Sequence, residues 1–210
     1  MDFDVLPGPP LAELARTTMA RAFAATVSWA GARDTVPMRA DRTGQPVLLP
    51  HGGSPLARDL AVEPAIVTIA VPAAAPFSSL RITGLTRPDS WHGGYPVILR
   101  SLEFTGSKPA PITPSEYGAA APDPFWREAP VVLQHLERCH IAELVGCVQA
   151  HGLTAAEYVV PRGLDRFGLE LLVFTSNGLA SVRLAYPDGP VNSLHEVPTS
   201  IRAVLTCRCD

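Results

Sequence analysis

Residues 65–87, AIVTIAVPAAAPFSSLRITGLTR, contain two short apolar runs, AIVTIAV and SSLRITGLTR, with a Pro- and Ala-rich segment between them. Runs of this length, rich in β-branched residues and bounded by proline or glycine, are typical of β-strands. The charge-free run over residues 64–80 contains three prolines, Pro64, Pro72 and Pro76, and is too short to cross a bilayer. We therefore expect two strands of a sheet here, not a membrane segment.

Four similar runs surround this pair, at residues 25–31, 34–41, 45–53 and 95–104, each bounded by Gly, Pro or Asp. Six short strands at even spacing favour a closed or half-closed antiparallel barrel over a parallel sheet. An amphipathic helix precedes them, starting after Pro10. Its apolar face is expected to consist of Leu11, Leu14, Ala15, Thr18 and Ala22.

The second half of the chain has a different pattern. Residues 109–125 are rich in Pro and Ala, have no period, and are expected to be a linker. A helix is expected from about residue 127 to 151, ended by Gly152, followed by three strands with turns at 163–168 and at Asn177-Gly178, and by a last helix over 198–208. The predicted fold class is α+β: a barrel domain over 8–108 and a helix–three strands–helix domain over 126–210.

Composition excludes several function classes. The net charge of −3 and a pI near 6.1 give no basic field for nucleic acid or an anionic membrane. The first ten residues, MDFDVLPGPP, lack the apolar core of a secretory signal, and the four cysteines form no disulfide framework, so we expect a cytoplasmic protein. Cys207 and Cys209 lack the second pair that a four-thiolate metal site needs. We find no phosphate-binding loop of the P-loop or Rossmann kind.

Residues 132–145, VLQHLERCHIAELV, place His135, Cys139 and His140 close together on the expected long helix. Residues five apart on a continuous helix differ by about 140° around the axis, so the two histidines should not ligate one ion from the same face. His140 aligns instead with an inward stripe of Leu133, Leu136, Leu144, Cys147 and His151. Two interpretations stay open: a core histidine with a backbone partner, or a ligand-facing histidine in a pocket between the two halves.

The sequence also resembles a known combination of domains. HLERCHIAEL resembles the opening helix of the DUF2470 family, LDRFGLEL its Asp-x-x-Gly hairpin (Asp165, Gly168), and VRLAYP its Val-Arg-x-x-Phe/Tyr strand. The preceding half resembles the FMN-binding split barrel of pyridoxamine 5'-phosphate oxidase-like proteins. Together they are similar to the HugZ-type haem-utilisation proteins and the chloroplast glutamyl-tRNA-reductase-binding proteins, over nearly the whole chain.

This resemblance implies a haem-binding protein and a homodimer that pairs through barrel faces. The catalytic residues are unknown, and a haem oxygenase-like activity is one open consequence. The alternatives are a non-enzymatic module that senses haem or docks a partner, and a flavin-dependent oxidoreductase. Flavin-using members carry Ser-Arg-Lys-Gly where this chain has Ser54-Pro55-Leu56-Ala57, so both cations for the FMN phosphate are missing and we expect FMN to bind poorly.

The candidate residues for binding a cofactor follow from this resemblance and from the positions of the histidines and arginines in the sequence. His140 is the first candidate for the iron ligand, because it matches the second histidine of the family run. His195 in VNSLHEVP is the second, and His51 beside Gly52-Gly53 is the third. Arg183 is a candidate for a haem propionate or a phosphate. Arg58 and Arg39 are the cations that would have to hold an FMN phosphate.

Overall fold

The structure is a computed structural model that describes residues 8–74, 76–87, 94–186, 188–193 and 195–197. The helix predicted over 198–208 lies outside the described residues. The chain divides into two compact units, one formed by residues 10–122 and the other by 123–210 together with 1–9. No helix within the described ranges is both long and apolar enough to span a bilayer.

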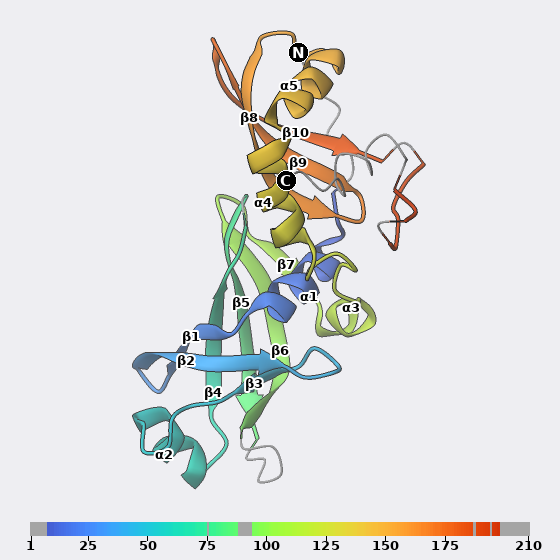
Figure 1. The fold of residues 1–210 in the computed structure, drawn as a ribbon. Helices are drawn as coiled ribbons and strands as arrows, with labels where there is room; N and C mark the ends of the chain where they lie inside the picture. The colour runs from blue at the N-terminus through green and yellow to red at the C-terminus, as the bar shows by residue number, and fades with distance from the viewer. Residues whose placement is uncertain (1–7, 75, 88–93, 187, 194, 198–210) are drawn as a thin grey trace. The chain divides into compact units, whose positions relative to one another are not determined.

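The first unit is a closed antiparallel barrel, as the strand spacing predicted. Its six strands run in the order β3-β2-β1-β4-β5-β6, and β3 also pairs with β6 to close the barrel (Figure 1). All of these pairings are antiparallel. The strands are β1 (Ala24–Trp29), β2 (Ala32–Ala40), β3 (Pro46–Leu48), β4 (Ile66–Pro72), β5 (Phe77–Thr86) and β6 (Tyr95–Gly106).

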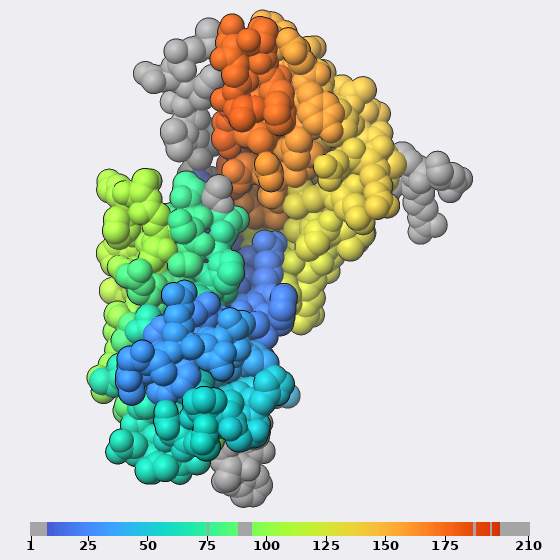
Figure 2. Space-filling view, turned by 90° about the vertical axis from the view of Figure 1, so that its left-hand side faces the viewer, coloured from blue at the N-terminus to red at the C-terminus, as the bar shows by residue number. Residues whose placement is uncertain are grey.

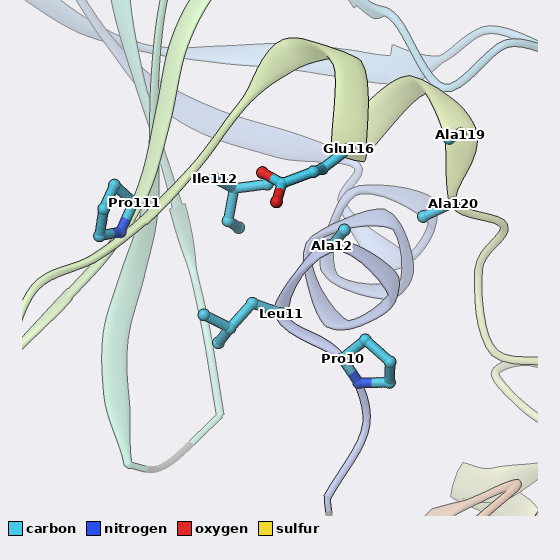
Figure 3. A pocket seen from close by; sticks show the side chains of 8 residues that line it. All are labelled: Pro10, Leu11, Ala12, Pro111, Ile112, Glu116, Ala119 and Ala120. Carbon is cyan, nitrogen blue, oxygen red and sulfur yellow. The ribbon is translucent and has the colours of Figure 1, made fainter.

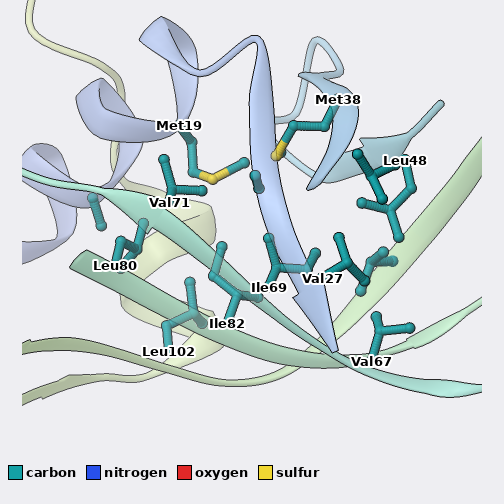
Figure 4. Packing of buried hydrophobic residues seen from close by; sticks show 14 of the residues in the cluster. Met19, Val27, Met38, Leu48, Val67, Ile69, Val71, Leu80, Ile82 and Leu102 are labelled. Atoms are coloured by element: carbon teal, nitrogen blue, oxygen red, sulfur yellow. The ribbon is translucent and has the colours of Figure 1, made fainter. Parts of the chain in front are cut away.

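The barrel interior is filled by alternate residues of its strands. Val27 of β1, Ile69 of β4 and Ile82 of β5 are fully buried and point into one cluster (Figure 4). The residues between them face outward, because successive side chains of a strand lie on opposite sides of the sheet. This period of two is the reason that the six strands could be recognised in the sequence.

Two helices cover parts of the barrel. In α1 (Leu11–Arg21) the buried apolar face is centred on Ala15 and Met19, whereas Leu11 is exposed. The predicted apolar face contained Ala15 but not Met19, so it was rotated about the helix axis relative to the face that is buried. In α2 (Pro55–Val62) the Ser54 hydroxyl accepts the N–H of Ala57 as an N-cap. The indole N–H of Trp29 donates to Asp59 Oδ2 at 2.8 Å and holds this helix against β1.

The predicted linker over 109–125 is not a plain connection. It contains strand β7 (Ala110–Ile112), which pairs with β6, and helix α3 (Pro114–Ala119), which begins with a capping box of Thr113 and Glu116. Tyr117 of α3 is buried, and its hydroxyl donates to the carbonyl of Gly44 at 2.7 Å. Burial raises the pKa of Tyr117 to about 12. β7 and α3 contain only three and six residues, too few for a period of apolar residues to be recognised in the sequence. Residues 110–122 belong to the barrel unit.

The second unit is a two-layer α+β domain. Its sheet has the order β10-β9-β8, with β8 (Ala156–Asp165), β9 (Gly168–Thr175) and β10 (Gly178–Ala185). Helices α4 (Ala129–Cys139) and α5 (Ile141–Ala150) both pack on β8. Figure 2 shows the helices in yellow beside the strands in orange. The turn predicted at Asn177-Gly178 is confirmed, as is Gly152 after the helix, with a φ of +100°. The turn predicted at 163–168 is shorter, because β8 extends to Asp165, which pairs with Gly168 of β9.

Replacing Tyr117 by Ala tests whether α3 is part of the barrel. We expect the free energy of unfolding to fall by about 3–5 kcal/mol, because a large buried aromatic ring and its hydrogen bond are lost. Chemical denaturation measures this change. The exposed neighbour Ser115→Ala serves as the control and should change stability little. Equal stability of both variants would mean that this segment is only a linker.

Candidate functional site

The helix predicted over residues 127–151 is divided at His140. This residue has φ −130° and ψ 21°, outside the helical range, and it is both the last cap of α4 and the first cap of α5. The His140 N–H donates to the carbonyl of Leu136 in α4, and the His140 carbonyl accepts the N–H of Leu144 in α5, so this residue is hydrogen-bonded to both helices. No proline or glycine lies at this position. The usual sequence signals of a helix end therefore could not reveal the break.

The break changes the relation between the two histidines. The ring centres of His135 and His140 are 5.1 Å apart, and the rings are inclined by 62°. The prediction that the two side chains point about 140° apart is wrong, because it assumed one continuous helix. His135 is half-buried and lies against His140. The structure thus brings together the two histidines that the sequence pattern had separated.

His140 is buried, with 7% of its surface exposed. Its Nδ1 lies 3.4 Å from Glu143 Oε1, which is longer than an ordinary hydrogen bond. The Glu143 backbone N–H, followed by the His140 imidazole, holds the pKa of the Glu143 carboxyl below its usual value. The Nδ1 atom of His140 thus faces the Glu143 carboxylate.

The predicted inward stripe is only partly buried. Leu136 and Leu144 belong to the core, Leu133 and Cys147 are half-buried, and His151 is exposed, so its assignment to the stripe was wrong. The Nδ1 atom of His151 lies 2.8 Å from the carbonyl oxygen of Cys147. Burial raises the pKa of the Cys147 thiol, which makes it a poor nucleophile. No group of three or more metal-ligating side chains occurs in the described ranges.

Arg183 forms an ion pair within the sheet. Its guanidinium donates two hydrogen bonds to the Asp165 carboxylate, at 2.8 and 2.7 Å, and both side chains are mostly buried. The Asp165 carboxylate also accepts the N–H of Phe167 in the β8–β9 turn. The residues of the Asp-x-x-Gly hairpin and of the Val-Arg strand therefore meet in one structural contact. A bidentate pair of this kind fixes geometry as well as charge.

Asp123 is a buried polar residue that the sequence analysis did not single out. It is 3% exposed, and its two carboxylate oxygens accept the N–H groups of Phe125 at 2.8 Å and Arg166 at 2.7 Å. It thereby ties the start of the second unit to the β8–β9 turn. Tyr186 is buried near these charges, and burial, followed by Asp165 and Asp123, raises the pKa of its hydroxyl. Nothing in the sequence around Asp123, which is rich in Pro and Ala, indicates that this aspartate is buried.

The other candidate residues lie on the surface. His195 is exposed in the second unit, and His51, Arg39 and Arg58 are exposed in the barrel unit. His51 precedes α2, where its carbonyl accepts the N–H of Ser54. No described contact joins any of these four to another candidate.

A groove of about 560 Å³ lies on the barrel unit between α1, β7 and α3 (Figure 3). It is lined mainly by small and apolar side chains: Pro10, Leu11, Ala12, Pro111, Ile112, Glu116, Ala119 and Ala120. Its one carboxylate, Glu116, already accepts hydrogen bonds from Thr113 in the capping box. None of the predicted cofactor residues lines this groove, so it is not the candidate site.

Comparison with solved structures supports the fold. A structure described as a heme binding protein from Mycobacterium smegmatis matches with a TM-score of 0.63 and 24% identity, covering 95% of this chain and 96% of that one. The protein Atu2129 of unknown function from Agrobacterium tumefaciens str. C58 matches with a TM-score of only 0.37, at 18% identity over 96% and 97% of the chains. No protein-family model matches this chain, and no curated protein matches it significantly. The first match and the closed barrel fit a split-barrel fold.

The Arg183–Asp165 pair yields a stability prediction. Asp165→Asn should lower the free energy of unfolding by about 1–3 kcal/mol, because it leaves a mostly buried guanidinium without its charged partner. Arg183→Lys should also destabilise, since an ammonium cannot reproduce the two-pronged contact. Chemical denaturation of both variants measures the effect. The exposed pair Arg81–Glu103 is the control: Glu103→Gln should cost no more than about 1 kcal/mol. Equal effects at the two pairs would contradict a structural role for Arg183.

Proposed function

We propose that this protein binds haem or a related tetrapyrrole, and that its second unit is a DUF2470-type domain following a split barrel. The observation that carries the proposal is the likeness, over almost the full length of both chains, to a protein described as heme binding. The residue pattern of the His135–His140 run and of the Asp165 hairpin supports it independently of that match.

His140 is the first candidate for the iron ligand. A histidine that ligates a metal commonly has its other ring nitrogen beside a carboxylate, and Glu143 lies next to Nδ1 of His140. Because His140 is 7% exposed, its ring would have to turn outward on binding, whereas His195 and His51 are already exposed. These three histidines are therefore the set to compare.

Bound haem would supply the iron chemistry, including oxygen activation if the protein degrades haem. The chain itself would contribute one histidine imidazole as a ligand to the iron and would orient the macrocycle. Arg183 remains a candidate for a propionate, but it already holds Asp165 with both prongs of its guanidinium. A propionate would have to compete with that carboxylate.

A sensing or partner-docking module needs the same ligand and pocket without turnover, so it is the second candidate function.

Titration of the purified protein with haemin tests the proposal. We expect saturable binding with a shifted Soret band. His140→Ala should weaken binding at least tenfold and shift the band, because the imidazole that binds the iron is lost, while circular dichroism shows a folded chain. Addition of ascorbate to the complex then separates degradation, which yields verdohaem or biliverdin, from storage or sensing.

The matched variants His195→Ala, His51→Ala and His135→Ala identify the ligand. If His140→Ala only lowers the melting temperature, His140 is a core histidine. The iron ligand is then the histidine, His195 or His51, whose replacement by Ala abolishes the band. If haemin gives no saturable spectrum with the unaltered chain, the proposed function is wrong.

The residues of the phosphate loop do not fit FMN. The Ser54 hydroxyl is used as the cap of α2, Pro55 has no N–H, and the side chain of Leu56 is buried. Neither of the positions that carry cations in flavin-using members offers one here. Only the exposed Arg39 and Arg58 could take their place.

A binding assay with FMN checks this expectation. Quenching of FMN fluorescence should show weak binding, because a phosphate dianion lacks charge partners in the loop. The double change Pro55→Arg and Leu56→Lys would restore the cations, although burial of Leu56 makes its replacement costly. Arg39→Ala and Arg58→Ala should have no effect on this weak binding. Tight, stoichiometric FMN that is lost in either of these variants would overturn the expectation.

We also propose that the protein is a homodimer that pairs through the barrel. Ile66 of β4, Leu85 of β5 and Ile98 of β6 lie side by side in register on the outer face, and Ile66 is 55% exposed. Apolar side chains aligned across three strands are suited to a self-complementary interface.

Light scattering tests the dimer. We expect twice the chain mass of 22.3 kDa at micromolar concentration, and a lower mass for Ile66→Asp, which places a charge in the interface. The exposed Val62→Asp at the end of α2 serves as the control. A mass of one chain for the unaltered protein would exclude the dimer.

A further inference from the structure

The break between α4 and α5 sets the distance between two imidazoles. In zinc proteins the ion lies about 2.0 Å from a histidine nitrogen and therefore about 3.2 Å from the centre of that ring. Two rings bound at the tetrahedral angle then have centres about 5.2 Å apart. The ring centres of His135 and His140 are 5.1 Å apart, and the rings are inclined by 62°. Their separation is therefore that of two histidines on one tetrahedral ion.

A carboxylate beside His140 gives a second, independent observation. One is needed, because edge-to-face contacts between aromatic rings cover the same range of distances. The Oε1 atom of Glu143 lies 3.4 Å from Nδ1 of His140. Histidines that ligate a metal commonly have a carboxylate next to the ring, which orients the ring and raises its basicity. Glu143 has the position of such an outer partner.

Solvent reaches this part of the second unit. His135 is half-buried, and the side chains of Cys139 and Glu143, at neighbouring positions, are exposed. Among the described residues, no third histidine, cysteine or carboxylate completes a ligand set. Water would therefore complete the coordination of an ion held by the two imidazoles. Such an ion binds more weakly, and exchanges more readily, than one in a structural site with four protein ligands.

The chemistry of two imidazoles selects the ion. Mg²⁺ and Ca²⁺ are bound by oxygen ligands, whereas imidazole nitrogen suits Zn²⁺, Ni²⁺ and Cu²⁺. We propose that His135 and His140 together bind one divalent transition-metal ion, with Glu143 as the carboxylate that orients His140. On a continuous helix the two histidines would point about 140° apart, so the site exists only because the helix is divided.

The ion site has a consequence for haem. One imidazole cannot be a ligand of Zn²⁺ and of haem iron at the same time, so the ion and haem compete for His140. Zn²⁺ should therefore weaken the binding of haemin. This competition rests on the proposed function, whereas the metal site itself does not.

Titration of the full chain with Zn²⁺, followed by calorimetry, tests the site. We expect one ion per chain. His135→Ala should weaken Zn²⁺ binding at least tenfold, because one of the two imidazoles is lost, while circular dichroism shows a folded chain. The test does not depend on replacing the buried His140, since His135 is half-buried. His151→Ala is the matched control: it removes an exposed histidine at the end of α5 and should leave the affinity unchanged.

Two further measurements examine the surroundings and the geometry of the ion. Glu143→Gln should weaken Zn²⁺ binding about tenfold, because carboxylates beside a ligating histidine typically contribute that much to metal affinity. Glu137→Gln, at an exposed position of α4, should have no effect. With Co²⁺ in place of Zn²⁺, the visible absorption bands of a tetrahedral ion should appear, and they should be lost in His135→Ala.

Three results would overturn the proposal. Absence of saturable binding of both ions, or equal affinity of the unaltered chain and His135→Ala, would mean that the two rings are only in edge contact. Binding that is lost in Cys139→Ser and kept in His135→Ala would assign the ion to the thiol instead.

A haemin titration with and without Zn²⁺ separates the metal site from the proposed function. Zn²⁺ should weaken haemin binding by the unaltered chain and should have no effect on His135→Ala. Saturable Zn²⁺ binding without any haemin spectrum would support the metal site and refute the proposed function. Haemin bound through His140 with an affinity that saturating Zn²⁺ does not change would contradict the metal site.

Discussion

The bend at His140 is the feature on which the candidate site depends. α4 and α5 both pack on β8, and the chain changes direction at one residue whose φ leaves the helical range and whose N–H and carbonyl are bonded to α4 and α5, respectively. Strands twist, and two short helices follow a twisted strand more closely than one straight helix does. The same change of direction places the ring of His135 5.1 Å from that of His140.

A second set of contacts holds the β8–β9 turn of this unit in place. Asp123 accepts backbone N–H groups at the start of the unit and in the β8–β9 turn, and Asp165 in that turn holds Arg183 of β10. These carboxylates are buried or mostly buried and have defined donors, so their cost of desolvation is offset by charge-assisted hydrogen bonds. The sheet is therefore positioned by polar contacts at one end and by apolar packing along its length.

The elements that could be predicted from the sequence are those whose sequence patterns span only a few neighbouring residues. The six barrel strands and the Asn177-Gly178 hairpin were found because alternation and turn residues are read within a few positions. Tyr117 and Asp123 were assigned to a linker, since their partners, Gly44 and Arg166, are distant in sequence. The relation of His135 to His140 was predicted wrongly for a different reason: the bend arises from packing on β8, and the sequence at the bend has neither proline nor glycine.

The most direct test of the account is nuclear magnetic resonance of the chain labelled with ¹⁵N in its histidines. Unpaired electrons of ferric haem broaden nearby nuclear signals, so one equivalent of haemin should remove the imidazole signals of His140 and of its neighbour His135. The signals of His51 and His195 should remain sharp. Loss of the His51 or His195 signals with an unchanged His140 would contradict the account, and unchanged signals from all of them would contradict haem binding itself.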